Sequence, residues 1–393
     1  MRSTRNRRAR RQVVTYGCIV WFIAIKTLLA DRGKLLTALL GVVFSVVLVN
    51  LQGGLFMGLI RKASLLVDYG QADIWVGHRG MHNVDFTQDV PIRWGHRIRG
   101  VPGVRTAEPY LIGWSNMALP SGSFESVVVV GCEPASLLGN AWNISQGQAS
   151  SILEPDGIVV DELEAEKLEY PGLRDLREIN GHRARIVATS RGILGFLVAP
   201  YVFTTLDRAA TYLDKPSDSC SYFLVQLEPG ANARDVCDLI HERVPHLDAL
   251  PRDEYAQMST EFWMTRTGLG IIFGAATQLG LLVGLVMVAQ TLYASVLDRI
   301  SEFGTLKAIG AKESQVYRIL LAQALTLATL GSIVGLVVVA VVQHYCSSPR
   351  TTILIPFSLS LGSCALVLAI CLVSSLLPYL RVRKVDPMMV LRS

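Results

Sequence analysis

Four stretches of the chain are apolar and free of charged residues for more than 18 consecutive positions. They cover residues 35–60, 268–297, 319–345 and 357–380. A helix rises about 1.5 Å per residue, so each run forms a helix longer than the ~30 Å hydrocarbon core of a bilayer. We therefore predict four transmembrane helices rather than buried helices of a soluble protein.

Residues 61–267 contain no such run, and their apolar residues follow shorter patterns. Strand-like stretches cover 72–77, 124–133, 157–162, 184–189 and 221–228, and helical patterns cover 92–99 and 231–244. The stretches "RIRGVPGVRTAEPY" (97–110) and "HERVPHLDALPRDEY" (241–255) are alike, because in each a helix ends at Val-Pro and the chain enters a strand. We predict two similar strand-helix-strand halves at opposite ends of 61–267, with the middle of the segment inserted between them.

The distribution of Lys and Arg predicts the orientation of these helices. Segments 1–34, 298–318 and 381–393 together carry 17 Lys and Arg against 5 Asp and Glu, whereas 61–267 carries 19 against 27. Short segments decide the positive-inside rule, so both termini and 298–318 are predicted to be cytoplasmic. The fold class that follows is an integral membrane α-helical protein with four transmembrane helices and a large α/β extracytoplasmic domain between helices 1 and 2.

This organisation divides the chain into nine parts. They are a cytoplasmic basic arm with an interfacial helix (1–34), transmembrane helix 1 (35–60), the extracytoplasmic domain (61–267), transmembrane helix 2 (268–297), a cytoplasmic loop (298–318), transmembrane helix 3 (319–345), a short extracytoplasmic loop (346–356), transmembrane helix 4 (357–380) and a cytoplasmic tail (381–393).

The N-terminal arm begins with "MRSTRNRRARRQ", which has six Arg in its first eleven residues. A signal peptide is one interpretation, but Lys26 and Asp31 interrupt the apolar stretch that follows, and no clear cleavage site is present. An interfacial helix whose Arg cluster binds anionic lipid fits the pattern better, and we predict no nucleic-acid binding.

Pairs of glycines four residues apart occur in every span except the last. Such GxxxG spacing lets two helix backbones approach closely. The predicted packing residues are Gly54, Gly58, Gly270, Gly274, Gly280, Gly284, Gly331 and Gly335. The first two pairs lie at the outer ends of helices 1 and 2, so we expect those helices to pack together there. Asn50, Gln52 and Gln290 are candidates for hydrogen bonds between helices.

The sequence lacks the residues and motifs that several kinds of transport and catalysis require. The spans hold no ionisable group apart from His344 at one end, which argues against an ion-coupled transporter. The chain has no GxSxG, HExxH or GxxxxGK[ST] motif, so we predict a non-catalytic subunit that binds no cofactor itself. The seven cysteines show no metal-ligand spacing; Cys220 and Cys237 could pair, although separate buried thiols are the simpler interpretation.

One polar cluster in the large domain deserves comparison with a metal site. His78 and His82 lie four residues apart, with Asp85 and Asp89 nearby. Their segment contains two glycines and has the composition of a loop, so the helical geometry that would align two histidines is not expected. We interpret the cluster as a polar surface loop.

The cytoplasmic loop 298–318, "DRISEFGTLKAIGAKESQVYR", interrupts two apolar spans with charge. Phe303, Leu306 and Ile309 recur every three residues on one face of a helix, and Gly310 suits the position just after a helix end. The pattern predicts a short amphipathic helix presented to the cytosol, which either connects the spans or binds a partner.

The stretch "SEFGTLKAIGA" (301–311) resembles the signature of FtsX-like and MacB-like permease subunits of ABC transporters. "QADIWVG", "VPGVRTAEPY", "EFWMTRTGLGIIFG", "VAQTLYASVLDRISEFGTLKAIGA" and "RVRKVDPMMVL" together resemble the DevC type most closely. The resemblance covers nearly the whole chain. Lys312 departs from the pattern, because many relatives have Ser or Thr there.

This resemblance implies a homodimeric permease whose cytosolic helix docks on a separate ABC ATPase dimer, which binds the ATP and Mg²⁺. The coupling element would comprise Glu302, Phe303, Gly304, Leu306, Lys307, Ala308 and Gly310. Relatives of the DevC type imply export of a glycolipid or another amphiphile across the bacterial inner membrane, with a periplasmic membrane-fusion adaptor and an outer-membrane duct. The alternative is an FtsX-like signalling permease that regulates an extracytoplasmic enzyme and transports nothing.

Overall fold

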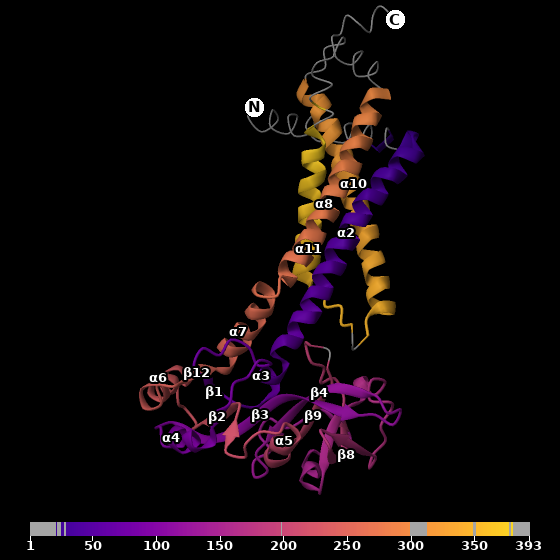
Figure 1. The fold of residues 1–393 in the computed structure, drawn as a ribbon. Helices are drawn as coiled ribbons and strands as arrows, with labels where there is room; N and C mark the ends of the chain where they lie inside the picture. The colour runs from indigo at the N-terminus through magenta and orange to yellow at the C-terminus, as the bar shows by residue number, and fades with distance from the viewer. Residues whose placement is uncertain are drawn as a thin grey trace, which may run out of the picture. The chain divides into compact units, whose positions relative to one another are not determined.

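The computed structural model describes residues 21, 25–26, 29–197, 199–298, 313–348, 351–376 and 379. These residues form two compact units, one made of the long apolar helices and one made mainly of residues 58–270. Figure 1 shows the elements of both units. Four helices are long and apolar enough to cross a membrane, and a large α/β domain lies between the first and second of them in the chain. The predicted fold class is confirmed.

The helices of the membrane unit differ from the predicted spans at their ends. They are α2 (Arg32–Ile60), α8 (Leu269–Asp298), α10 (Glu313–Cys346) and α11 (Phe357–Ser374). The helix α10 begins six residues before the predicted boundary, because the polar residues that precede the apolar run continue the same helix. Residues 1–20 of the basic arm and the tail 380–393 lie outside the described part of the chain.

The helix α2 packs against each of the other three helices of this unit. Its residues Ala38, Val42 and Val46 are buried in one apolar cluster with side chains of α8, α10 and α11. Small and β-branched side chains dominate the α2 side of this cluster, which allows the neighbouring helices to approach closely. The first span is therefore the central helix of the described bundle.

The outer unit is built on one ten-stranded mixed sheet and a separate two-stranded sheet. The strands are β1 (Ile74–His78), β2 (Val90–Pro91), β3 (Val104–Ala118), β4 (Phe124–Cys132), β5 (Ile144–Gln146), β6 (Gly157–Asp161), β7 (Leu176–Ile179), β8 (His182–Ser190), β9 (Tyr201–Thr205), β10 (Ser219–Cys220), β11 (Tyr222–Leu227) and β12 (Leu247–Pro251). The helices are η1 (Arg61–Ser64), α3 (Leu65–Tyr69), η2 (Ile92–Trp94), α4 (Gly95–Arg99), η3 (Ala149–Leu153), η4 (Glu162–Glu164), α5 (Leu206–Tyr212), α6 (Ala233–Arg243) and α7 (Arg252–Thr265).

Four of these strands form a ferredoxin-like half. The spatial order β12-β1-β11-β3 is antiparallel throughout, and the chain order is β1-α4-β3 followed by β11-α6-β12. These are the two predicted strand-helix-strand halves, and the arrangement is the ferredoxin-like βαββαβ motif. The residues between β3 and β11 form an insert that extends the same sheet through β4, β9, β6, β8 and β5, with β7 paired to β3 and β8. The prediction of two halves with an inserted middle is confirmed.

Alternate residues of the central strands pack into two different hydrophobic cores. In β11, Tyr222 and Leu224 pack into a cluster with Trp75, whereas Phe223 and Val225 pack into a cluster beneath α4 and α6. The period of two along a strand places consecutive side chains on opposite faces of the sheet. Both faces of this half are therefore covered, which explains why its strands are almost continuously apolar.

Gly268 separates the last helix of the outer unit from α8. Its φ is +72°, a conformation that glycine adopts without a steric penalty. The preceding helix α7 ends at Thr265, and the N–H of Arg266 still donates to the carbonyl of Phe262 at 2.8 Å. A left-handed glycine shortly after the last helical hydrogen bond ends α7 and allows a new helix to begin.

Candidate functional site

The loop between α8 and α10 is the predicted coupling site. Its seven candidate residues, Glu302, Phe303, Gly304, Leu306, Lys307, Ala308 and Gly310, lie within 299–312, outside the described residues. The structure instead describes the helix ends from which this loop leaves and to which it returns. The helix α8 ends at Asp298 and α10 begins at Glu313.

An ion pair joins the start of α2 to the end of α8 beside this loop. Lys34 Nζ pairs with a carboxylate oxygen of Asp298, and it also lies 3.3 Å from Asp31 Oδ2. Asp31 Oδ1 accepts a hydrogen bond from the Lys34 N–H at 3.2 Å, which satisfies one free donor at the beginning of α2. That hydrogen bond and the Lys34 ammonium lower the pKa of Asp31. Lys34 and Asp298 carry opposite charges at two span ends that are predicted to lie on the same side, which allows this contact but does not single it out.

Aromatic and aliphatic side chains join α10 to the end of the fourth span at the same end of the bundle. The rings of Tyr317 and Tyr379 are 4.9 Å apart between centroids. Tyr379 also packs against the buried pair Val296 and Leu320, which come from α8 and α10. All four spans are thus connected to a neighbour at the ends that are predicted to be cytoplasmic.

Two of the predicted glycine pairs lie against α2. A Cβ added to Gly280 or Gly284 of α8 would overlap the side chains of Leu48 and Ser45, respectively. The second pair belongs to α10, where a Cβ on Gly331 would overlap Val42 and one on Gly335 would lie 2.8 Å from Val46 Cβ. In addition, Ser45 Oγ donates to the Gly280 carbonyl at 3.1 Å. Glycine is required at these positions because α2 leaves no room for a larger side chain.

Among the described residues, the predicted contact of α2 with α8 at their outer ends is not made by the other two glycine pairs. A Cβ on Gly54 would meet Ile355 and Ile353, which precede α11, and one on Gly270 would meet the Met264 carbonyl of its own chain segment. No atom from another part of the described chain lies within 4 Å of the Cβ position of Gly274, and Gly58 is buried in the outer unit.

At that level α2 and α8 meet through aromatic rings instead. The centroids of Phe56 and Phe273 are 5.2 Å apart. The described contact between the outer ends of these helices is thus made by two large rings and not by glycines.

Asn50 is the centre of a polar cluster inside the bundle. It is fully buried, and its Nδ2 donates to Ser363 Oγ at 2.7 Å and to the Val46 carbonyl at 2.8 Å. Ser360 Oγ donates to Asn50 Oδ1 at 3.3 Å. These bonds connect α2 to α11. Among the described residues, neither Gln52 nor Gln290 has a hydrogen-bond partner.

The candidate metal ligands of the outer unit do not converge. His78 lies in β1, Asp89 forms an ion pair with Lys215, and the described residues contain no group of three His, Cys, Asp or Glu side chains placed to hold a metal ion. Asp85 is buried, with Oδ1 accepting from Tyr201 Oη at 3.3 Å and Oδ2 lacking a partner in the described residues. Burial raises the pKa of Asp85 to about 6.

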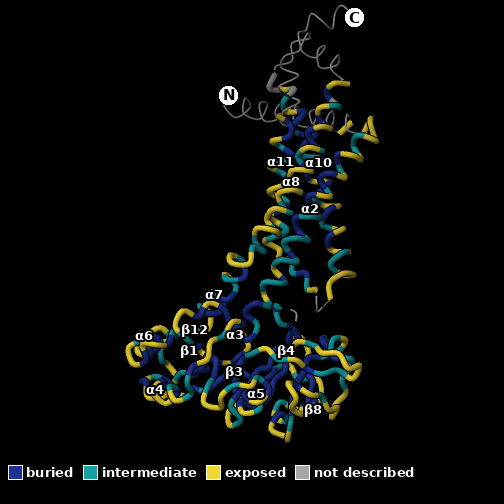
Figure 2. The backbone as a smooth tube through the Cα atoms, in the orientation of Figure 1, coloured by how far each residue is buried: buried dark blue, intermediate teal, exposed yellow. Residues whose placement is uncertain are grey.

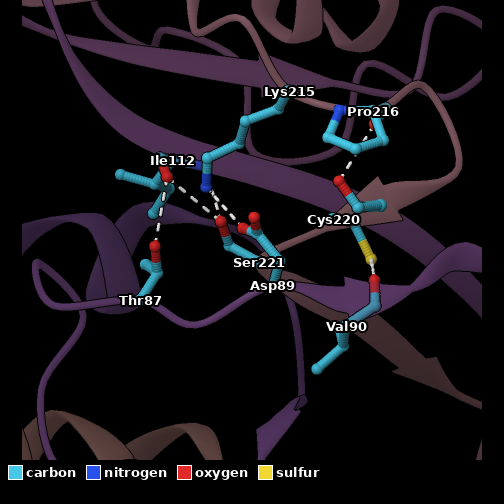
Figure 3. A network of polar contacts seen from close by, with 9 residues as sticks. Thr87, Asp89, Val90, Ile112, Lys215, Pro216, Cys220 and Ser221 are labelled. Atoms are coloured by element: carbon cyan, nitrogen blue, oxygen red, sulfur yellow. Dashed lines mark hydrogen bonds and ion pairs between the residues drawn. The ribbon is translucent and has the colours of Figure 1, made fainter.

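The Asp89–Lys215 pair belongs to a network at the neck of the insert. Figure 3 shows Thr87 Oγ1 and Ser221 Oγ both donating to the Ile112 carbonyl, at 3.2 Å and 3.1 Å. Beside them, Cys220 Sγ donates to the Val90 carbonyl at 3.6 Å, and this buried thiol forms no disulfide. The network ties the segment after β1 to the strands through which the insert leaves and returns.

Comparison with known families covers both units. Residues 35–242 match the MacB-like periplasmic core domain, and residues 274–387 match the FtsX-like permease C-terminal region. The chain belongs to the MacB/FtsX-type family of ABC transporter permeases. No curated protein matches it.

Two solved structures are similar to this permease. The periplasmic region of MacB from Actinobacillus actinomycetemcomitans is 11% identical over 48% of this chain and 92% of its own, with a TM-score of 0.37. The extracellular domain of the ABC-type transporter YknZ from Gram-positive bacteria is 11% identical over 45% of this chain and 98% of its own, with a TM-score of 0.35. Family membership and the four apolar helices make the chain a membrane permease with an extracytoplasmic domain.

Proposed function

We propose that the chain is the permease subunit of an ATP-driven exporter and works as a homodimer with a separate ABC ATPase dimer. The observation that carries this proposal is the position of the 302–310 signature between α8 and α10, on the side of the membrane where Lys and Arg are concentrated. The chain lacks a P-loop motif, so ATP and Mg²⁺ would be bound by the partner.

The described helix ends support a mechanical role for this loop. The Lys34–Asp298 pair links the first two spans beside it, and these are the spans that continue into the outer unit. The helix α2 is followed without a break by η1 and α3, and α8 follows α7 after Gly268. A movement that the ATPase imposes on residues 302–310 would therefore act on both covalent connections to the extracytoplasmic domain.

Cargo and further partners follow from the resemblance to the DevC type. We propose a glycolipid or another amphiphile as cargo, and a periplasmic membrane-fusion adaptor with an outer-membrane duct as the route. The setting would be the bacterial inner membrane, with both termini cytoplasmic and the basic arm 1–34 on anionic lipid. The match of residues 274–387 to the FtsX-like region supports a second function, in which the same movement regulates an extracytoplasmic enzyme.

Substitutions in the coupling loop test the proposal. Glu302→Lys or Gly310→Pro should leave the permease inserted and folded but abolish stimulation of ATP hydrolysis by cargo in the reconstituted complex. Lys312→Ser is the matched control, because it restores the residue type of many relatives and should retain stimulation. Unchanged stimulation in both loop variants would exclude coupling through this element.

The same complex distinguishes the two functions. An exporter should move a fluorescent amphiphile out of the membrane of proteoliposomes when ATP is added. An intact complex that hydrolyses ATP and releases no amphiphile, yet activates an extracytoplasmic cell-wall hydrolase, would favour regulation.

A further inference from the structure

The carboxyl group of Asp85 is buried inside the outer unit with few partners. Asp85 lies in the segment between β1 and β2 and is 8% exposed. Figure 2 shows that β1, which precedes this segment in the chain, is buried as well. Asp85 Oδ1 accepts from Tyr201 Oη at 3.3 Å, and Oδ2 has no partner among the described residues. A carboxylate that is removed from water and holds one long hydrogen bond is disfavoured relative to the neutral acid.

A second buried carboxyl group of the same unit has the partners that Asp85 lacks. Asp161 is 2% exposed and accepts from the N–H groups of Leu163 and Ile193 at 2.9 Å and 2.7 Å. Ser190 Oγ also donates to it, at 3.0 Å. Several donors aimed at one side chain stabilise a carboxylate inside a protein. The two sites therefore differ, because the surroundings of Asp161 suit a charged side chain and those of Asp85 suit a neutral one.

Uncharged groups face the carboxyl group of Asp85 in the described structure. Tyr201 of β9, Tyr222 of β11 and Tyr255 of α7 are the titratable ones, and burial raises the pKa of each. The Trp263 indole N–H faces the carboxyl group from α7, outside hydrogen-bonding geometry. Within the described ranges no Lys, Arg or His side chain interacts with it. The tyrosines stay neutral, whereas burial raises the pKa of Asp85 to about 6, so its charge changes close to neutral pH.

The segment that carries Asp85 packs against the last turns of α7. The ring centroid of Phe86 lies 5.8 Å from that of Trp263 and 6.1 Å from that of Phe262. Trp263 is 5% exposed and shares an apolar cluster with Ala63 of η1, the element that follows α2. The helix α8 begins six residues after Trp263. Trp263 is therefore in contact with the Asp85 segment and with the residues through which the chain enters the outer unit.

Hydrogen bonds connect the same segment to α7 by a second route. Tyr255 Oη donates to Tyr222 Oη at 2.9 Å, and Tyr222 Oη donates to the Asn83 carbonyl at 3.0 Å. Asn83 Oδ1 in turn accepts from the Asp85 N–H at 2.5 Å. A charge on Asp85 favours contact with water, and water competes for each of these bonds. Ionisation of Asp85 therefore weakens the packing of residues 83–86 on α7.

We propose that Asp85 is a proton-binding site whose occupancy sets how firmly α7 is held to the rest of the outer unit. With the proton bound, the neutral carboxyl group stays buried and Trp263 stays packed. When the proton passes to water, the carboxylate favours an open form in which residues 83–86 leave α7. Acid on the extracytoplasmic side therefore strengthens the attachment of the helix that precedes α8. The inference concerns the outer unit and does not depend on the proposed export function.

Proton linkage gives the direction and size of the effect. The pKa of about 6 in the folded chain lies above the ordinary value of 3.8, so the closed form binds the proton more tightly than an open form that exposes Asp85. The added stability is full below about pH 4 and is lost as the pH rises through 6. Between pH 7.5 and pH 5 the population of the open form should fall about tenfold.

Hydrogen exchange of the full-length permease in detergent micelles measures this opening. Exchange is recorded between pH 5 and pH 7.5, with labelling times corrected for the intrinsic exchange rate, and the peptide that covers α5 is the internal reference. The amides of α7 should exchange about tenfold more slowly at pH 5 than at pH 7.5, with a midpoint near pH 6. Asp85→Asn, which mimics the neutral acid, should keep α7 at its acid level of protection at every pH.

Two further variants distinguish a proton site from a purely structural residue. Tyr201→Phe removes the hydroxyl that stabilises the carboxylate, and Trp263→Phe removes the indole N–H while keeping an aromatic ring. Each should move the midpoint to a higher pH. Asp89→Asn is the matched control, because Asp89 lies in the same segment but pairs with Lys215, and it should leave the midpoint unchanged. A purely structural role would alter protection equally at every pH without moving the midpoint.

Infrared difference spectroscopy detects the proton itself. A band of a protonated carboxyl group should be present at pH 5, lost by pH 7.5 and missing from Asp85→Asn. Protection of α7 that does not vary with pH, or that varies equally in Asp85→Asn, would overturn the proposal. Since no ATPase takes part in these measurements, loss of coupling in the loop variants would leave the proton site standing.

Discussion

The outer domain and the membrane unit are each stabilised internally by a different kind of side chain. The core of the outer domain contains Trp75, whose ring centroid lies 5.7, 5.4 and 5.8 Å from those of Tyr110, Tyr222 and Tyr255. The membrane unit instead places glycines against α2. Water makes burial of large apolar side chains favourable, whereas lipid is as apolar as leucine, so stability in the bilayer depends on close backbone contact. Each region is thus built for the solvent that surrounds it.

The largest effect is expected from Trp75→Ala, which empties the aromatic core of the outer domain. Trp75 is fully buried, so its removal should lower the free energy of unfolding of this domain by about 3 to 5 kcal/mol. Phe124→Ala is the control, because Phe124 is 71% exposed and should change stability by less than about 0.5 kcal/mol. Urea unfolding of the full-length chain, followed by protease sensitivity of the outer domain, measures both. Equal effects of the two variants would show that the aromatic cluster is not the main core.

The next largest effect is the pH dependence of stability that the buried carboxyl group of Asp85 gives the outer domain. Its folded pKa of about 6 lies above the ordinary value of 3.8, so the folded chain binds this proton more tightly than the unfolded chain. The contribution of Asp85 to the free energy of unfolding is therefore largest below about pH 4. It falls as the pH rises through 6, by about 3 kcal/mol at most. Asp85→Asn should remove this part of the pH dependence, measured as urea unfolding midpoints of the outer domain between pH 4 and 7.5. Identical pH profiles of the two proteins would contradict the prediction.

Replacing a glycine of α8 by leucine tests whether the membrane unit depends on close contact between helices. Gly284→Leu should destabilise the helix bundle by about 1 to 3 kcal/mol, because its side chain would overlap Ser45 of α2. Gly274→Leu places the same side chain at a position with no neighbouring atom within 4 Å in the described part of the chain, so it should leave the bundle of one chain unchanged. Thermal unfolding in detergent distinguishes them. A bundle that tolerates both substitutions equally would not depend on close contact between α2 and α8.

The smallest loss of stability is expected from substitution of Asn50, whose buried side-chain amide is hydrogen-bonded within the bundle. Asn50→Leu should cost about 0.6 to 2 kcal/mol, because the bonds to Ser363 and Ser360 are lost while leucine still fills the space. Asn50→Asp, which keeps the size but loses the donors, should be worse. Resistance of the bundle to unfolding by sodium dodecyl sulfate gives both values. If leucine increased stability, the cluster would serve specificity rather than stability.

Much of the fold could be predicted from sequence, because its signals are local. Long runs without charge locate the spans, and the repeated Val-Pro at the end of a helix revealed the two halves of the ferredoxin-like region. The glycines at the outer ends of α2 and α8 were expected to bring these helices together, whereas Phe56 and Phe273 make the contact. The reason is that GxxxG spacing shows that one face of a helix is small and not which neighbour it meets. The Lys34–Asp298 pair was missed for a similar reason, since residues 264 positions apart share no local pattern. The coupling residues rest on resemblance, and residues 299–312 lie outside the described part of the chain.

The pairing of β1 with β12 brings the two ends of the outer domain's chain together at one edge of the sheet. These neighbouring strands align along their whole length, from Ile74 opposite Pro251 to His78 opposite Leu247. The chain enters the domain just before one of them and leaves directly after the other. The segment η1, which precedes β1, also packs against α7, which follows β12, and Ser259 Oγ donates to the Ala63 carbonyl at 2.8 Å.

The insert leaves and returns at another neighbouring pair, where Tyr110 lies opposite Tyr222. The insert nevertheless contacts both connections, because the ring centroid of its Phe196 lies 4.1 Å from that of Trp263 in α7 and its Trp142 stacks on Tyr69 of α3 at 5.0 Å. Replacing the insert by a short hairpin between β3 and β11 would therefore remove packing from both the entering and the leaving helix.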